Sequence, residues 1–245
     1  MNARDIPEDG TTPEVTAPEC AFRCIAEAGP GTGMDGDGFV IDGPDLDADH
    51  LRAAAAVVLP TQGAGRAAGL LASGARGVLL GEAALRDSSI VTMLAGEFGK
   101  ERIGVYVPAR RLEVRWSFDT VSNADFRVLT PSLGAPAWEV LLADGAGTGT
   151  QALWWIDAML ELGATQALLR VDIRDDADLN LCADCVERFG QRLWIGPLAD
   201  EAPATADWIA FGHVRQMVLP PALLAAQAQA QATRLAQTEP AMAAG

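Results

Sequence analysis

Four cysteines have the spacing that most directly suggests chemistry. They occur as two close pairs, Cys20-x-x-x-Cys24 and Cys182-x-x-Cys185, and close thiols can bind zinc or cycle between a dithiol and a disulfide. Cys182 and Cys185 fall in the helical pattern Leu179–Phe189, which lacks the tight turn of a zinc ribbon, and Cys24 falls in an apolar strand. These surroundings favour a structural role, and we predict no metal site and no cofactor.

Carboxylates and hydroxyls next to apolar runs are the second group of candidates. Asp42 precedes Gly43-Pro44, so it can be an active-site acid or can only begin a turn. Thr148 and Thr150 precede a helical pattern, where they can contact a ligand or cap the helix. A cluster of aspartates is typical of a solvated loop but could also touch a substrate. Its members are Asp172, Asp175, Asp176 and Asp178.

The composition narrows the class of protein. The 245 residues are 49% hydrophobic, enough for one sizeable core. Thirty-three acidic residues against 18 basic ones give a formal charge of −15, which repels nucleic acid and anionic lipid. No apolar run reaches the roughly 18 residues of a membrane helix. We expect a cytoplasmic protein that binds no nucleic acid and no membrane, although helix N-termini can still hold a phosphorylated small molecule.

Eight short runs rich in Val, Ile, Leu and small residues predict buried strands. Their apolar residues are continuous rather than alternating, which favours a parallel sheet covered on both faces. The runs are Phe22–Glu27, Phe39–Asp42, Ala55–Leu59, Gly77–Gly81, Ile103–Pro108, Ala167–Asp172, Arg192–Gly196 and Trp208–Phe211.

Helical patterns lie between these runs, and each is followed by a glycine. Glycine at this place supplies the left-handed residue that closes a helix. The patterns are Gly65–Ser73, Ser88–Phe98, Thr150–Leu162 and Leu179–Phe189. The βαβα rhythm predicts an α/β fold, either a TIM-type barrel or a doubly wound sheet.

Two segments interrupt this rhythm. Ala28–Gly38 is too short and Gly-rich to form a crossover helix. We therefore expect the first quarter of the fold to be trimmed, without a helix between its first two strands. Residues 111–137 form an insertion after the fifth strand, in which alternating residues predict a β-hairpin over one end of the fold. We therefore divide the chain into a disordered arm (1–20), a barrel with this insertion (21–221) and an Ala/Gln-rich solvated tail (222–245).

The order and spacing of several segments between Gly65 and Gly196 carry a further signal. They are Gly74–Ser88, Leu94–Gly99, Ile103–Arg110, Trp138–Val140, Thr148-Gly149 and Glu161–Ala164. Together they resemble the cyclase subunit of imidazole glycerol phosphate synthase and, less closely, the related histidine-biosynthesis isomerase. The resemblance implies a (βα)₈ barrel with two phosphate sites, and with catalytic aspartates at the C-terminal ends of the first and fifth strands.

The chain departs from that pattern at both catalytic positions. The fifth strand reads Val107-Pro108-Ala109-Arg110, and proline can neither give nor accept a proton. The first strand offers Ala28 or Gly29, with Glu27 nearby. Among the phosphate elements, Pro197 removes an N–H donor and Glu82 would repel a phosphate.

The polar positions that survive supply the candidate site. By the resemblance, the catalytic candidates are Asp42, Glu27 and Asp175. The candidates for binding substrate or phosphate are Gly63, Gly65, Gly81, Thr148, Gly149 and Arg174.

Two functional hypotheses follow. One is a non-catalytic or repurposed barrel that has lost the acid–base pair, with the hairpin as a contact surface. The other is an active lyase or isomerase on a phosphorylated sugar or aminosugar. The partners implied are a glutamine amidotransferase-like subunit or a second copy of the chain, and a phosphorylated small molecule.

Overall fold

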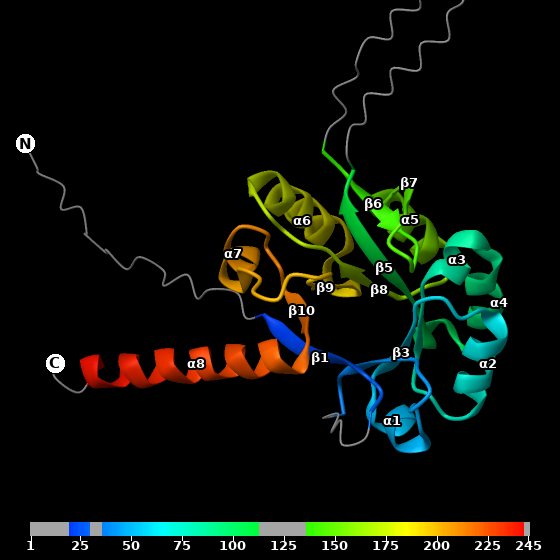
Figure 1. The fold of residues 1–245 in the computed structure, drawn as a ribbon, viewed down its shortest axis with the longest axis horizontal. Coiled ribbons are helices and arrows are strands. Elements are labelled where there is room, and N and C mark those ends of the chain that lie inside the picture. The colour runs from blue at the N-terminus through cyan, green and yellow to red at the C-terminus, as the bar shows by residue number, and fades with distance from the viewer. Residues whose placement is uncertain (1–19, 30–35, 113–135, 243–245) are drawn as a thin grey trace, which may run out of the picture.

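Eight parallel strands form a closed ring in the computed structural model, which describes residues 20–29, 36–112 and 136–242 (Figure 1). Each strand pairs with its neighbours, and β4 also pairs with β5, which closes the ring. The prediction of a TIM-like α/β barrel is therefore confirmed. In ring order the strands are β1 (Ala21–Glu27), β2 (Phe39–Ile41), β3 (Ala56–Leu59), β4 (Val78–Leu80), β5 (Ile103–Arg111), β8 (Gln166–Arg170), β9 (Leu193–Gly196) and β10 (Gln216–Leu219).

Helices surround the ring and alternate with its strands along the chain (Figure 1). The four predicted helices are present within one or two residues at most ends, and Gly99 and Gly163, which follow two of them, have φ angles of 93° and 115°. None of the described helices is long and apolar enough to cross a membrane. The helices are α1 (Ala48–Ala53), α2 (Ala64–Ala72), α3 (Glu82–Arg86), α4 (Ser89–Phe98), α5 (Ala152–Glu161), α6 (Asp176–Phe189), α7 (Thr205–Ala210) and α8 (Pro221–Met242), with short 3₁₀ turns η1 (Lys100–Arg102) and η2 (Gly190–Arg192).

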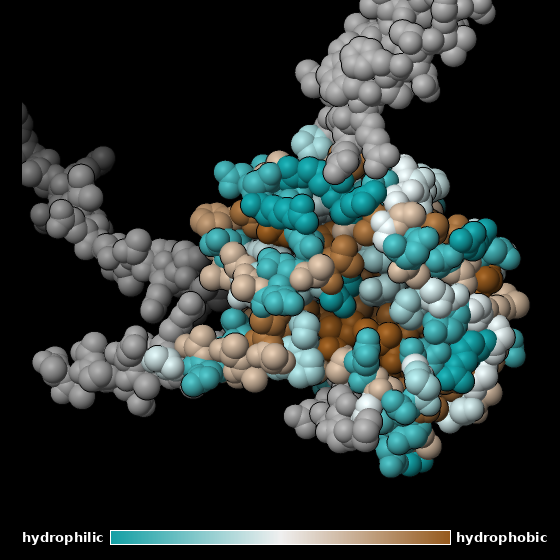
Figure 2. Space-filling view, viewed as in Figure 1, coloured by the Kyte–Doolittle hydropathy of each residue, from teal (hydrophilic) through white to brown (hydrophobic). Residues whose placement is uncertain are grey.

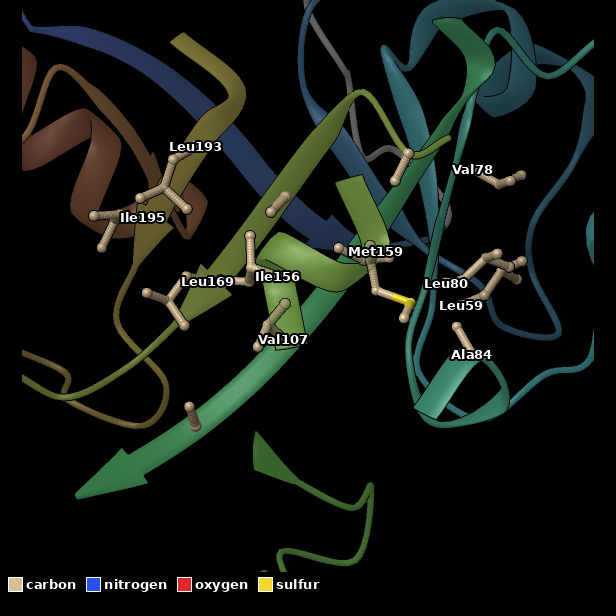
Figure 3. Packing of buried hydrophobic residues seen from close by; sticks show 14 of the residues in the cluster. Leu59, Val78, Leu80, Ala84, Val107, Ile156, Met159, Leu169, Leu193 and Ile195 are labelled. Carbon is tan, nitrogen blue, oxygen red and sulfur yellow. The ribbon is translucent and has the colours of Figure 1, made fainter. Parts of the chain in front are cut away.

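The main core lies between the outer face of the ring and the helices. Side chains on the outer face of the strands, such as Val107 and Leu169, lie close to Ile156 and Met159 of α5 (Figure 3). All four are at most 3% exposed. Apolar residues gather near the middle of the face in Figure 2, whereas polar residues predominate over α6. Burial on both faces of the strands explains their continuous apolar sequences.

A second cluster fills the inside of the ring. Ile25, Phe39, Leu168 and Trp194 belong to it, and the rings of Phe39 and Trp194 meet edge to face with centroids 5.8 Å apart. The Arg23 guanidinium lies 4.2 Å from the centroid of the Trp194 ring, a cation–π contact. The ring therefore encloses packed side chains.

The prediction of a strand at Trp208–Phe211 is wrong. Trp208 lies in α7, and the eighth strand of the ring is β10, which pairs with β1 and β9. A four-residue apolar run fits a buried helical turn as well as a strand. The Trp208 side chain is fully buried from the helix, so burial alone could not distinguish the two.

The first crossover contains no helix in its described residues, as the trimmed first quarter predicts. The segment 222–245, predicted to be a solvated tail, begins in α8, where Leu223 and Leu224 pack against the core. The start of α8 contacts both β1 and β10, and the helix then extends away from the barrel (Figure 1). It therefore covers part of the first strand, which lacks a crossover helix of its own.

Strand β5 continues beyond the ring into a small antiparallel sheet. Its last residues, Ala109–Arg111, pair with β6 (Trp138–Leu141), which pairs in turn with β7 (Gly147–Gln151). The predicted hairpin between residues 113 and 129 lies outside the described residues. The strands on either side of the insertion are antiparallel, so the chain leaves and re-enters the barrel at one place.

Gly196 provides a test of how tightly β9 and β10 approach. A Cβ atom at Gly196 would lie 2.4 Å from the carbonyl oxygen of Val218, which is backbone and cannot move aside. We expect Gly196→Ala to lower the free energy of unfolding by about 1–3 kcal/mol, the usual cost of overpacking. The measurement is urea-induced unfolding.

The matched control is Gly69→Ala in α2, where a Cβ would meet no atom within 4 Å. This change should raise stability by up to about 1 kcal/mol, because alanine favours a helix over glycine. Equal stability of the two variants would contradict the close approach of the strands.

Candidate functional site

Asp42, the first catalytic candidate, is held by an arginine of the same chain. Its side chain is only 6% exposed, and Arg66 of α2 binds both carboxylate oxygens, Nε to Oδ2 at 3.1 Å and Nη2 to Oδ1 at 2.6 Å. The hydrogen bond also raises the pKa of Arg66. A carboxylate engaged on both oxygens has little capacity left to take a proton from a ligand.

Asp175, the second candidate, belongs to an ion-pair cluster at the start of α6. It accepts the N–H of Asp178 as the N-cap of the helix and also binds Arg111, which donates from Nη1 at 2.8 Å and from Nη2. Arg111 lowers the pKa of Asp175 to about 2. Asp175 is therefore ionised and paired at neutral pH, unlike a general base poised near neutrality.

Asp178 completes this cluster from a buried position. Its side chain is 3% exposed and accepts hydrogen bonds from Arg111 Nε, from Trp138 Nε1 and from the backbone N–H of Arg174, each at 3.0 Å. The interpretation of this aspartate as part of a solvated loop is wrong. Asp178 instead ties the end of β5 and the start of β6 to α6.

Asp172 fills an amide cup in the loop after β9. The backbone N–H groups of Leu198, Ala199 and Asp200 donate to its Oδ1 at 2.9, 2.9 and 3.0 Å. Its side chain is 14% exposed. Successive N–H groups that converge on one point are the usual way in which a loop holds an anion. Here the anion is a side chain of the protein, so a solvated-loop interpretation is again wrong for Asp172.

Thr148 and Gly149 stabilise the β6–β7 turn. Thr148 Oγ1 donates to the carbonyl of Val140 at 2.7 Å, and the Gly149 N–H donates to Glu139 Oε2 at 3.1 Å. Glu139 is 7% exposed and also accepts from Arg110 Nε at 3.0 Å. Helix α5 begins after Gln151 with no side-chain cap, so the predicted capping role of the threonines is wrong.

Glu27 differs from the other two catalytic candidates, Asp42 and Asp175. It lies at the end of β1, is exposed, and its side chain forms no hydrogen bond or ion pair with the described residues. Pro108, which stands near the fifth-strand catalytic position, pairs in register with Arg170 of β8. Among the three catalytic candidates, Glu27 is thus the one without a described partner, and β5 carries no carboxylate.

The glycines and Arg174 lie at the same end but in different settings. Gly63 and Gly65 are exposed at the start of α2. Gly81 is buried, and a Cβ there would lie 2.6 Å from the carbonyl oxygen of Pro60, so packing alone accounts for it. The Arg174 side chain is 81% exposed, with Asp172 3.9 Å away.

Glu82, predicted to repel a phosphate, is bound within the chain. It accepts from Arg86 Nε at 2.7 Å and from the Ala143 N–H at 3.1 Å. The Ala143 hydrogen bond is the main cause of a lowered pKa at Glu82, followed by Arg86. Glu82 therefore links α3 to the β6–β7 turn.

Arg170 is a buried cation at the C-terminal end of the ring. It is 9% exposed, and its described partners are the carbonyl oxygens of Pro197 and of Leu198, the latter 3.3 Å from Nη2. It forms no ion pair with a described carboxylate, and burial lowers its pKa. A guanidinium has five N–H donors, so these two acceptors do not use its full capacity.

Two pockets adjoin the loop after β9. One, of about 410 Å³, is lined by Arg170, by Pro197–Glu201, and by Pro220, Ala222 and Leu223 at the start of α8. The other, of about 570 Å³, lies beside the Arg111 cluster and is lined by arginines and aspartates that already pair with one another. The first pocket is therefore lined by one cation, Arg170, and by two carboxylates, Asp200 and Glu201, none of which forms a described ion pair.

Cys182 and Cys185 pack in the interior of the protein as structural residues. Cys182 and Cys185 are buried in α6, and burial raises the pKa of Cys185 to about 12 and raises that of Cys182. A raised thiol pKa disfavours the thiolate that metal binding and redox chemistry require. No group of three or more potential metal ligands occurs among the residues that the structure describes.

Sequence reasoning missed the arginines that pair with the aspartates at this end of the barrel. Arg66 and Arg111 lie 24 and 64 residues from their aspartate partners, and no local pattern links them. Arg170 was detectable, because it is the charged residue in an otherwise mainly apolar strand, two positions after the inward-facing Leu168.

A scan against protein-family models and a search of curated proteins both find no match for this chain.

Removing the Asp172 carboxylate tests the amide cup. We expect Asp172→Ala to lower the free energy of unfolding by about 1.5–3 kcal/mol, because three backbone N–H groups lose a charged acceptor. Asp172→Asn, which keeps one neutral acceptor, should lose less. Chemical denaturation measures both, and the exposed Glu187→Ala provides a control expected to change stability by no more than about 0.5 kcal/mol. A change no larger than in the control would mean that the cup contributes little.

Proposed function

We propose that this chain is a repurposed barrel that binds an anionic small molecule at the C-terminal end of its strands without general acid–base catalysis. In this proposal it is a divergent relative of the histidine-biosynthesis cyclase that its sequence resembles. The observation that carries the proposal is Arg170, a buried cation that lines a pocket and has no described carboxylate partner. The catalytic candidates Asp42 and Asp175, in contrast, are each paired with an arginine of the chain.

The state of the catalytic candidates argues against acid–base turnover. Asp42 is held by Arg66, and Asp175 is held by Arg111. General acid or base catalysis contributes about 10²–10⁴ in rate for each group. A barrel that has Pro108 on its fifth strand and a paired Asp42 after its second therefore lacks most of this contribution.

The amide cup supports the same conclusion. Glycine-rich loops after barrel strands hold phosphates through backbone N–H groups. In this chain the N–H groups of Leu198, Ala199 and Asp200 are already occupied by Asp172. A phosphate at that position would have to displace a carboxylate of the protein itself.

Arg170 provides the attraction for a ligand. Burial lowers the pKa of Arg170, and the nearby charge of Asp172 offsets this only in part. An anion that enters the pocket would offset the remaining cost of burying the guanidinium. Helix α8 begins at the same pocket, and the positive end of its dipole favours an anion there. The guanidinium can bind two oxygens of a phosphate or carboxylate at once.

The pocket wall narrows the class of ligand. Asp200 and Glu201 also line it, and carboxylates repel a ligand that is anionic throughout. They can accept hydrogen bonds from hydroxyl or ammonium groups. A phosphorylated sugar or aminosugar, which has an anionic end and a hydroxyl-rich or amino-bearing end, satisfies both requirements.

A second candidate function, an active lyase or isomerase on such a phosphorylated sugar, is favoured by one observation. Glu27 at the end of β1 is exposed and unpaired among the described residues. Of the three catalytic candidates, it is therefore the one with most freedom to move a proton.

Arg170 substitutions test the binding site. We expect wild-type protein to bind inorganic phosphate and, more tightly, ribose 5-phosphate in isothermal titration calorimetry. Arg170→Gln should weaken both affinities at least tenfold, because a bidentate charged contact is lost. Arg170→Lys, which keeps a point charge, should bind with intermediate affinity.

The control is Arg188→Gln on α6, an arginine that pairs with Asp157 away from the pocket. It should leave both affinities unchanged. Circular dichroism verifies that each variant is folded. Equal affinity of wild type and a folded Arg170→Gln would refute the site.

A turnover assay separates the two candidate functions. We expect the purified chain, supplied with ammonia and the ribonucleotide substrate of the histidine-pathway cyclase, to form no product above a heat-inactivated control. If product does form and Glu27→Gln abolishes it while leaving ligand affinity unchanged, the enzyme hypothesis replaces the binding proposal.

A further inference from the structure

The described basic residues divide into two groups according to their partners. Those with a carboxylate partner lie on outer helices or near the C-terminal ends of strands, as Arg66, Arg111 and Arg188 do. Those without an ion pair to a described carboxylate, apart from Arg170, occupy the opposite end of the barrel. Apart from Arg170, the described basic residues without an ion pair therefore lie at the N-terminal end of the barrel.

We term this second group the basic rim. Each member lies near the start of a barrel strand or within a few residues before one, and because the strands are parallel, these positions share the N-terminal end of the ring. The rim consists of Arg23, Arg76, Lys100, Arg102, Arg192 and Arg215.

Most of the rim is accessible to solvent, and its described acidic neighbours include Asp37 and Glu101. Arg76, Lys100, Arg192 and Arg215 are exposed. Arg23 is partly buried, and its pKa is lowered mainly by burial and further by the nearby positive charge of Arg76, whereas Asp37 opposes the shift. The positive charges of Arg23 and Arg76 repel each other, and an acidic occupant would relieve this repulsion.

An acidic segment of the same chain starts at this rim. Residues 1–19 contain Asp5, Glu8, Asp9, Glu14 and Glu19 against the single basic residue Arg4. The segment leads into β1, whose Ala21 N–H donates to the carbonyl of Arg215 at 2.8 Å. Its attachment point therefore lies within the rim.

The length of the segment is sufficient to reach every rim residue. Nineteen extended residues span about 65 Å. Lys100 precedes β5, which lies four strands from β1 in the ring, and neighbouring strands are separated by about 4.8 Å. The number of residues in the segment therefore exceeds what is needed to reach Lys100.

We propose that the acidic segment Met1–Glu19 docks on the basic rim of its own barrel. Opposite charge supplies the attraction, and tethering gives the segment an effective concentration that a free acidic partner would have to exceed. The surface is separate from the Arg170 pocket, so the proposal does not depend on the function assigned to that pocket.

Zero-length cross-linking tests this contact directly. Lys100 is the sole lysine of the sequence, so a carbodiimide can join its amine to a nearby carboxylate at a site that mass spectrometry identifies without ambiguity. In the monomer at low ionic strength we expect Lys100 cross-linked to Asp5, Glu8, Asp9 or Glu14. The yield should fall severalfold in 1 M NaCl, where the Debye length is about 3 Å.

Charge variants provide the matched control. Arg192→Gln combined with Arg215→Gln should reduce the yield severalfold, whereas Arg174→Gln combined with Arg188→Gln, which removes the same charge elsewhere, should not change it. A low-salt monomer without arm-to-Lys100 cross-links would overturn the proposal. Cross-links confined to a dimer would overturn it too, because the segment would then bind a second copy.

A stability measurement gives a second, independent readout. The full chain with Asp5, Glu8, Asp9, Glu14 and Glu19 changed to their amides should unfold at a lower temperature than wild type at low salt. The difference should vanish in 1 M NaCl. Identical midpoints at low salt would contradict docking.

Discussion

Pairing between β4 and β5 closes the ring, and this closure determines where the charged side chains lie. A closed sheet has no free edge, and its parallel strands bring all of their C-terminal ends to one side. Asp42, Arg170 and Asp172, which are far apart in sequence, therefore meet at one end of the barrel. Because the interior is filled by side chains such as Phe39 and Trp194, the two ends are separate surfaces.

Strand β8 and the residues after it control the C-terminal end through two opposite charges. Arg170 holds carbonyl oxygens of the loop after β9, and Asp172 holds N–H groups of the same loop. The loop is thus clamped by donors on one side and by an acceptor on the other. This clamp fills a potential anion site with Asp172 and at the same time leaves part of the Arg170 guanidinium facing a pocket.

The elements of the barrel were largely predictable, whereas the site was not. Seven strands and four helices follow from continuous apolar runs and from closing glycines, because both signals are local. The eighth strand was missed because Trp208–Phe211 is apolar enough for either structure. The pairing of Asp42 with Arg66 and of Asp175 with Arg111 depends on tertiary contacts, and neither spacing nor composition encodes these.

Ring closure joins the first strand to the last, since Ala21 pairs with Gln216. A ribosome that synthesises this chain must therefore release almost all of the barrel before β1 acquires its second neighbour. Until then β1 has an open edge, and contacts between such distant residues form slowly. The nascent barrel is consequently exposed to edge-to-edge association during synthesis, and the start of α8, which covers β1 and β10, can complete the wall only after β10 has paired.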